Sequence, residues 1–253
     1  MADNVQRDKP TLVLLHGWGL NQGVWQGIAP MLQKHCRLLT PDLPGFGHNT
    51  QFPDGYALKP VLAQIAEAIP QQSLVCGWSL GGLLAIALAR YYPDKVRQLG
   101  LIAASPSFLA KEDWPGMAAG VMQQFSQALS QQLEQTIGRF LAIQAMGSAS
   151  AKADIMQLKQ VISAYPVPTE AAVTGALRLL AEQDLRADFA AICQPIAGCY
   201  GLLDSLVPVS IVPLLQQLQP DAHLTLVPHA SHAPFISHQA ELLSWFEQWL
   251  SRA

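Results

Sequence analysis

Short, uninterrupted apolar runs alternate with amphipathic segments near both ends of the chain. An apolar run of about five residues is typical of a strand buried on both faces, as parallel sheets require. Such runs predict strands at residues 11–15, 37–40, 73–76, 96–103, 196–200 and 224–227. The segments between them predict helices at residues 23–34, 58–69, 80–91, 209–218 and 240–250. This alternation indicates an α/β fold with a mainly parallel, doubly wound sheet.

The alternation stops in the middle of the chain. From about residue 107 to residue 186 the apolar positions follow helical spacing, and strand-like runs are few. The alternation resumes after Pro195. We therefore expect a helical cap, residues 107–186, inserted into a core domain formed by residues 1–106 and 187–253.

A serine stands at a predicted strand-to-helix turn, in the sequence Gly77-Trp78-Ser79-Leu80-Gly81. A turn this sharp strains the serine backbone, and bulky residues at the two glycine positions would clash. The alternative is a glycine-rich turn with an ordinary helix-capping serine. The strand–turn–helix context is similar to the nucleophile turn of the α/β-hydrolases and favours Ser79 as a nucleophile.

A serine hydroxyl needs a base that takes its proton, and a histidine held by a carboxylate serves that purpose. In the α/β-hydrolase fold the acid and the histidine follow the serine along the chain. His232, in the loop after the last predicted strand, is the preferred base. His229, nearer the strand end, is its main rival, and His238 lies nearer the final helix.

The acid is expected after the second-last strand. Asp204 follows that strand, in a loop that leads into a helix, although an aspartate there is also compatible with a simple helix start. Asp184 and Asp188, at the end of the predicted cap, are weaker candidates. We therefore predict Asp204 as the partner of His232.

Two backbone N–H groups are expected to bind the oxyanion of an acyl-transfer intermediate. One is the N–H of Leu80, directly after the serine, and the other is that of Trp18, in the loop after the first strand. His16 stands at the end of that strand, and its position favours a hydrogen-bonded structural role over that of a base.

Charge and composition exclude several classes of function. Charged residues make up 13% of the chain, about half the usual share, and the net charge is −3 without a long basic run. Nucleic-acid binding therefore has no electrostatic support. The longest uncharged stretch, residues 68–89, is interrupted by turn residues, which argues against a membrane span. Residues 1–10 are polar and lack a signal-peptide core, so we expect a cytoplasmic protein.

The four cysteines lack metal-site or paired spacing and are predicted to be buried free thiols. Only about ten residues precede the first strand, so the antiparallel strand pair that usually opens this fold is expected to be reduced.

The chain closely resembles the pimeloyl-[acyl-carrier protein] methyl ester esterases of biotin synthesis. The resembling stretches cover nearly the whole chain in order, at residues 12–21, 42–47, 77–83, 113–116, 139–147 and 230–238. Residues 77–83 are generic to α/β-hydrolases, whereas residues 139–147 and 233–238 are much more specific.

The resemblance implies hydrolysis of the methyl ester of a pimeloyl chain on acyl carrier protein, which frees the distal carboxylate and releases methanol. No metal or cofactor is implied, and the enzyme is expected to be a monomer. The residues implied to line the substrate site are Trp18, Ser79, Leu80, Phe140, Gln144 and His232. Phe140 is also compatible with a plain core role in a cap helix.

The family docks its acidic carrier through basic cap residues. Arg139, Lys152 and Lys159 occupy the matching region, whereas Gln135 and Met156 stand where basic residues are expected. Other hypotheses remain open: a general short-chain carboxylesterase, a C–C bond hydrolase, or a non-catalytic ligand-binding member of the fold.

Overall fold

One parallel sheet organises the molecule. The computed structural model describes residues 9–129, 132–144 and 151–252, and at some positions within two helices it describes the backbone alone. The strands are β1 (Thr11–Leu15), β2 (Arg37–Leu39), β3 (Ser73–Trp78), β4 (Val96–Ile102), β5 (Ile196–Gly201) and β6 (His223–Val227). Their order across the sheet is β2-β1-β3-β4-β5-β6, and every neighbouring pair is parallel. The predicted α/β fold is thereby confirmed.

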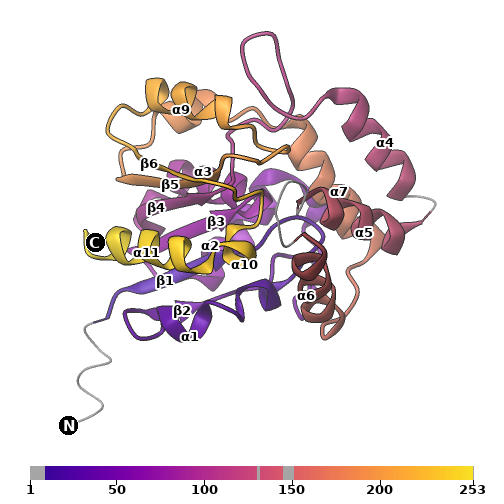
Figure 1. The fold of residues 1–253 in the computed structure, drawn as a ribbon, viewed down its shortest axis with the longest axis horizontal. Helices are drawn as coiled ribbons and strands as arrows, with labels where there is room; N and C mark the ends of the chain where they lie inside the picture. Colours follow the sequence, from indigo (N-terminus) through magenta and orange to yellow (C-terminus); the bar gives the residue numbers. More distant parts are fainter. Residues whose placement is uncertain (1–8, 130–131, 145–150, 253) are drawn as a thin grey trace.

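Helices cover both faces of this sheet. In Figure 1, α11 lies in front of the strands and α3 lies behind them. The α-helices outside the middle segment are α1 (Ala29–Leu32), α2 (Leu58–Ala68), α3 (Leu80–Tyr91), α8 (Arg186–Ala190), α9 (Val212–Leu218), α10 (Pro234–Ser237) and α11 (Gln239–Leu250). Short 3-10 helices are η1 (Gln22–Trp25), η2 (Asp54–Tyr56), η3 (Pro93–Lys95) and η4 (Val209–Ile211). Because both faces are covered, the central strand β3 is buried along its whole length, as its apolar sequence requires.

In the described residues, five α-helices lie between β4 and β5, and we call the first four the cap helices. They are α4 (Ala119–Leu129), α5 (Leu133–Gln144), α6 (Ala151–Ser163) and α7 (Glu170–Glu182). Figure 1 shows them gathered on one side of the molecule, away from both termini. The segments that lead into and out of them lie side by side, since the Leu185 N–H donates to the Pro106 carbonyl at 2.8 Å. The predicted domain boundaries at 107 and 186 remain a prediction.

Some local predictions were wrong. The single helix expected at residues 23–34 is split into η1 and the one-turn helix α1. Pro30 stands in the first turn of α1, where its missing N–H costs nothing, and its ring prevents a continuous helix through that point. All four cysteines are free, but Cys193 is exposed rather than buried. The expected reduction of the opening strand pair concerns residues 1–8, which lie outside the described residues.

Candidate active site

Ser79 occupies a strained turn between β3 and α3. Its backbone angles are φ 55° and ψ −118°, in the left-handed half of conformational space that a non-glycine residue rarely adopts. A Cβ at Gly77 would lie 2.1 Å from the Gly81 carbonyl oxygen, and a Cβ at Gly81 would lie 2.3 Å from that of Leu15. Both glycines are therefore required by close backbone approach, as the sequence predicts.

Asp204 and His232 form a buried pair. The Nδ1 of His232 lies 2.8 Å from Oδ2 of Asp204, and both side chains are almost completely shielded from solvent. The other carboxylate oxygen, Oδ1, accepts N–H groups from Leu206 at 2.8 Å and Val207 at 3.0 Å. Since an ionised carboxylate only accepts hydrogen bonds, Nδ1 carries the proton and Nε2 carries a lone pair. Nε2 is buried and has no hydrogen-bond partner among the described residues.

The alternative candidates for the base and the acid are either exposed or paired with residues outside the site. His229 is exposed, and the ring of His238 is hydrogen bonded to its neighbour Ser237. Asp184 pairs with Lys111 and Arg186 at the surface, and these cations hold the pKa of its carboxyl well below the usual range. Asp188 lies near Arg90 and accepts the Tyr91 hydroxyl. Among the candidates, the structure brings together only Asp204 and His232.

The two predicted oxyanion donors lie on adjacent loops. Leu80 is the first residue of α3, and first-turn N–H groups of a helix lack intrahelical acceptors. A Cβ at Gly81 would also lie 2.7 Å from the His16 carbonyl oxygen, so the start of α3 touches the backbone that leads to Trp18. This contact brings the backbone before Trp18 to the first turn of α3, and the role of the two N–H groups as oxyanion donors stays a prediction.

His16 is a structural residue, as predicted. Its Nδ1 lies 2.9 Å from the Gly17 carbonyl oxygen, and its Nε2 accepts the N–H of Leu43 at 2.9 Å. Burial lowers the pKa of His16 to about 4, although the hydrogen bond to Gly17 and the charge of Asp42 oppose this shift. The neutral imidazole therefore fastens the loop after β1 to the loop after β2.

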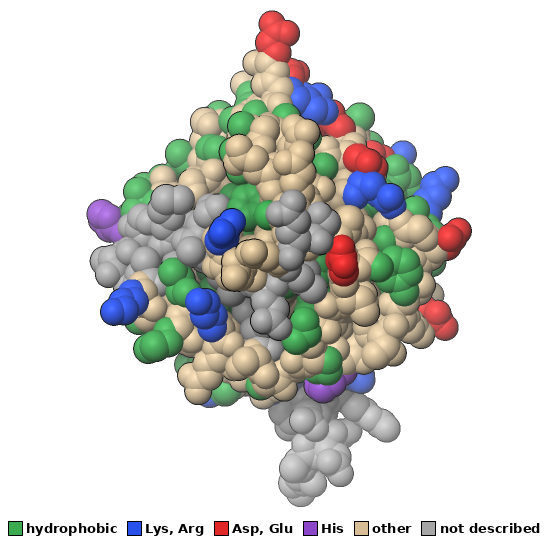
Figure 2. Space-filling view, turned by 90° about the vertical axis from the view of Figure 1, so that its right-hand side faces the viewer, with side chains coloured by type: hydrophobic (Ala, Val, Ile, Leu, Met, Phe, Trp, Pro, Cys, Tyr) green, Lys and Arg blue, Asp and Glu red, His purple; other side chains and the backbone are tan. Residues whose placement is uncertain are grey.

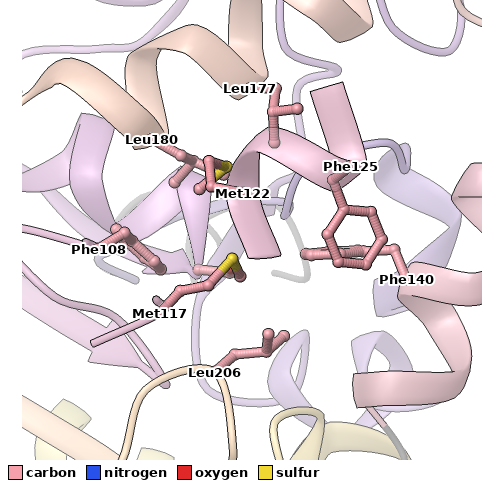
Figure 3. Close-up of a pocket in the computed structure, with 9 residues that line it drawn as sticks. Phe108, Met117, Met122, Phe125, Phe140, Leu177, Leu180 and Leu206 are labelled. Atoms are coloured by element: carbon pink, nitrogen blue, oxygen red, sulfur yellow. The ribbon is translucent and has the colours of Figure 1, made fainter. Parts of the chain in front are cut away.

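An apolar pocket opens beside Ser79. Figure 3 shows apolar side chains converging on it from several elements. Besides Ser79, the lining residues are Phe108, Met117, Met122, Phe125, Phe140, Leu177, Leu180 and Leu206. Apart from the serine hydroxyl, these side chains present only carbon and sulfur. The pocket thus suits a neutral aliphatic group held between the cap helices and the core.

Phe140 lies in this pocket, and its contact with the substrate stays a prediction. Its ring packs edge-on against Trp18 with centroids 4.7 Å apart, and against Phe125 at 5.6 Å. The other lining residues were not predicted as site residues. For Met122 and Leu177 the signal was amphipathic periodicity, which marks an inward face without distinguishing packing from ligand contact. Gln144 ends α5, and its side chain lies outside the described residues.

The three predicted carrier-docking cations are exposed on the cap helices. Arg139 lies on α5, and Lys152 and Lys159 lie on α6. Figure 2 shows this side of the molecule, where Lys and Arg side chains stand apart from one another among hydrophobic and uncharged atoms. No ion pair involves these three residues within the described part of the chain. The surface is therefore sparsely basic rather than a continuous positive field.

Two features are absent from the described residues. No group of three His, Cys, Asp or Glu side chains is arranged to hold a metal ion. None of the helices has both the length and the apolar content needed to cross a membrane.

A serine on a strained turn, beside a buried aspartate–histidine pair at the carboxyl ends of parallel strands, defines the hydrolase class of this fold. The chain belongs to the alpha/beta hydrolase fold family, because the sequence model of that family matches residues 10–239. Among solved structures, it is similar to a thermophilic esterase from Thermogutta terrifontis, with a TM-score of 0.81, 20% identity and coverage of 96% of this chain and 90% of that one. It is also similar to the enol-lactonase from Burkholderia xenovorans LB400, with a TM-score of 0.83, 18% identity and coverage of 96% and 92%. At these identities the likeness shows the fold alone.

Relatives at higher identity share one name. The chain is 49% identical to the "Pimeloyl-[acyl-carrier protein] methyl ester esterase" of Pseudoalteromonas atlantica, over 92% of each chain. It is 44% identical to the protein of that name from Aeromonas hydrophila, over 99% of this chain and all of the relative. The resemblance predicted from the sequence is thereby confirmed.

Proposed function

We propose that this chain is a serine carboxylesterase that hydrolyses the methyl ester of pimeloyl-acyl carrier protein in biotin synthesis. The observation that carries the proposal is the hydrogen-bonded Asp204–His232 pair, together with Ser79 at the end of an apolar pocket. The shared name of the relatives supports the choice of substrate.

The reaction runs through an acyl-enzyme. Nε2 of His232 takes the proton of Ser79 while the Ser79 oxygen attacks the ester carbonyl carbon. The C–O bond to methanol then breaks, and the leaving oxygen takes the proton from His232. A water molecule repeats the sequence on the acyl-enzyme and frees the acid. Asp204 keeps the proton on Nδ1 and stabilises the imidazolium that forms twice in each cycle.

The N–H groups of Trp18 and Leu80 bind the developing oxyanion. Each such donor typically lowers the barrier by about 3 kcal/mol. They act on charge that appears only in the transition state, so they raise kcat more than they tighten substrate binding.

The apolar lining of the pocket suits the aliphatic part of the proposed substrate. A pimeloyl methyl ester is neutral along its chain, and transfer of each CH₂ group from water into an apolar site is worth about 0.8 kcal/mol. Phe140 contributes to this surface through its position in the pocket. Gln144 is the polar residue that the family resemblance adds to the substrate site.

Carrier docking is proposed at Arg139, Lys152 and Lys159. Their exposure and positive charge suit an acidic partner. Isolated exposed charges contribute little individually, each about 0.2–1 kcal/mol, so the three are expected to act on encounter and orientation. A triple change to glutamine should raise KM for the carrier-bound ester and leave turnover of a free methyl ester unchanged.

The enzyme works in the cytoplasm as a monomer in this scheme, with residues 107–186 forming the cap over a core of residues 1–106 and 187–253. The hydrogen bond between Leu185 and Pro106 supports this division, since a compact insertion needs its ends close together. Sedimentation of the purified chain tests the monomer.

The second candidate function is a general short-chain carboxylesterase, favoured by the pocket lining, in which every described side chain except that of Ser79 is apolar. Turnover of carrier-bound pimeloyl methyl ester, free dimethyl pimelate and p-nitrophenyl acetate separates the two functions. A clear preference for the carrier-bound ester supports the proposal, and a preference for the acetate contradicts it. Complementation of a biotin-requiring strain that lacks this esterase tests the physiological role.

The variant Ser79→Ala distinguishes an enzyme from a ligand-binding homologue. It should lose at least about 10³-fold in kcat with an unchanged melting temperature. A wild-type chain that hydrolyses none of the three esters would instead support the ligand-binding hypothesis.

A further inference from the structure

Trp78 lies at the centre of the site without reaching the pocket. It is the last residue of β3, directly before Ser79, and its side chain is completely buried. Its indole N–H donates to the backbone carbonyl oxygen of His232 at 2.8 Å. The two residues are 154 positions apart, so this bond joins the nucleophile turn to the loop that carries the base.

The same indole ring also contacts the loop of the oxyanion donor. A Cβ at Gly17 would lie 2.9 Å from two carbons of the Trp78 ring, so the ring lies directly against the backbone before Trp18. On its other sides the ring is packed edge-on against Phe235, with centroids 4.7 Å apart, and lies 5.7 Å from the imidazole of His232. One rigid side chain therefore joins the nucleophile turn to the loop that carries Trp18 and to the loop that carries His232.

His232 needs a second restraint because Asp204 holds only its ring. The bond from Nδ1 to Asp204 leaves the backbone of the loop at residues 228–233 to be fixed by other contacts. This loop has no regular secondary structure, and His229 within it adopts a left-handed φ of 61°. A shift of the His232 Cα would carry Nε2 away from Ser79 even if the bond to Asp204 persisted.

We propose that Trp78 is a positioning residue that holds the His232 backbone at a fixed place relative to Ser79 through its indole N–H. The role rests on the proposed chemistry of Ser79 and His232, and it adds to that chemistry a residue that touches neither the substrate nor the reacting atoms. Misplacement of a reacting group by about 1 Å can cost about 10²-fold in rate.

The variant Trp78→Phe keeps an aromatic ring and removes the donor. A second replacement, by 3-benzothienylalanine, changes only the N–H to sulfur and protects the test against a failure to fold. Two tryptophans provide matched controls, since Trp25 and Trp249 are buried and their Nε1 atoms have no hydrogen-bond partner among the described residues. Trp25→Phe controls for loss of ring volume near Trp78, and Trp249→Phe controls for loss of ring volume in α11.

The first readout is the split between kcat and KM with p-nitrophenyl acetate, which does not depend on the physiological substrate. Both Trp78 replacements should lower kcat at least tenfold and keep KM within twofold, while the two control variants keep kcat within twofold of the wild type. Equal kcat values in Trp78→Phe and Trp25→Phe would overturn the proposal.

The second readout is the downfield NMR resonance of the proton between His232 and Asp204, assigned by its loss in His232→Ala. It should broaden or disappear in Trp78→Phe and persist in Trp25→Phe. This signal does not require esterase activity, so it also decides the role of Trp78 if the proposed function fails. A sharp, unshifted resonance in Trp78→Phe would contradict the positioning role.

Discussion

The indole N–H of Trp18 donates to the backbone carbonyl oxygen of Val173 at 2.9 Å. Trp18 belongs to the loop after β1, and Val173 lies in the cap helix α7. The loop that supplies a proposed oxyanion donor is therefore fastened to the cap by a buried hydrogen bond. This hydrogen bond and the packing of Trp18 on Phe140 of α5 link the position of the cap to the loop beside Ser79.

The variant Trp18→Phe should weaken this link. It keeps the ring that packs on Phe140 and removes a hydrogen bond with a net value of about 1 kcal/mol, so kcat/KM should fall about fivefold. Trp114→Phe is the control, because the Trp114 indole donates to the Ser107 carbonyl at 3.0 Å outside the predicted site. Both variants should melt at a lower temperature, but only Trp18→Phe should lower kcat/KM. An equal loss of kcat/KM in both would contradict the link.

Asp204→Asn should reduce kcat by about 10³–10⁴-fold. The amide presents a donor where the carboxylate accepts, so it disfavours the His232 tautomer with the proton on Nδ1 and no longer stabilises the imidazolium. Steady-state kinetics with p-nitrophenyl acetate measure the effect. Asp184→Asn removes a carboxylate that pairs with Arg186 at 2.8 Å at the surface, and it should keep kcat within twofold. A large loss in Asp184→Asn beside a small loss in Asp204→Asn would reassign the acid.

His16 should make stability depend on pH on the acid side of neutrality. Burial lowers the pKa of His16 from 6.5 to about 4, so between these values the unfolded chain binds a proton that the folded chain does not. The free energy of unfolding that His16 contributes is complete above pH 6.5 and falls as the pH falls toward 4, by up to about 3 kcal/mol. Urea unfolding of the wild type, His16→Gln and the exposed control His35→Gln at several pH values tests this. The His16 variant should show the flatter dependence, and identical slopes in all three proteins would refute the assignment.

Phe140→Ala should weaken binding of long acyl esters. Loss of a ring that lines the pocket removes apolar contact, so KM for dimethyl pimelate should rise about tenfold, whereas KM for p-nitrophenyl acetate should change much less. Phe52→Ala is the matched control, since Phe52 is 48% exposed outside the pocket. A rise of the same size for both esters in Phe140→Ala would show that the ring does not act on the acyl chain.

The predicted site residues came from positions that follow strands. Ser79, Asp204 and His232 come after β3, β5 and β6, and in a parallel sheet the carboxyl ends of the strands meet at one edge. Chain order together with this rule was enough to bring the three residues to the same place. The 2.8 Å bond between Asp204 and His232 was not predictable, because loop geometry depends on contacts such as those of Leu206 and Val207.

The residues that line the pocket and the role of Trp78 could not be predicted from the sequence, for a physical reason. Phe108 and Met117 lie in irregular structure before α4, where no periodicity indicates which way a side chain points. The contact of Trp78 with the His232 carbonyl joins distant parts of the chain, and no local pattern encodes it. The helix expected at residues 23–34 is a similar case. The apolar spacing there is helical, but Pro30 stands in the first turn of a new helix, α1, and the spacing alone does not show this break.

The apolar lining of the pocket has a consequence for the end of the reaction. Hydrolysis converts a neutral ester into an anion, and among the described residues the pocket lining contains no cation to neutralise it. A carboxylate that moved from Ser79 to the part of the pocket beside Met117 and Leu206 would lose hydration without gaining a cation, which costs several kcal/mol. In the proposed reaction the apolar lining therefore favours the neutral ester over the charged acid, so the enzyme should bind its product more weakly than its substrate as that product accumulates.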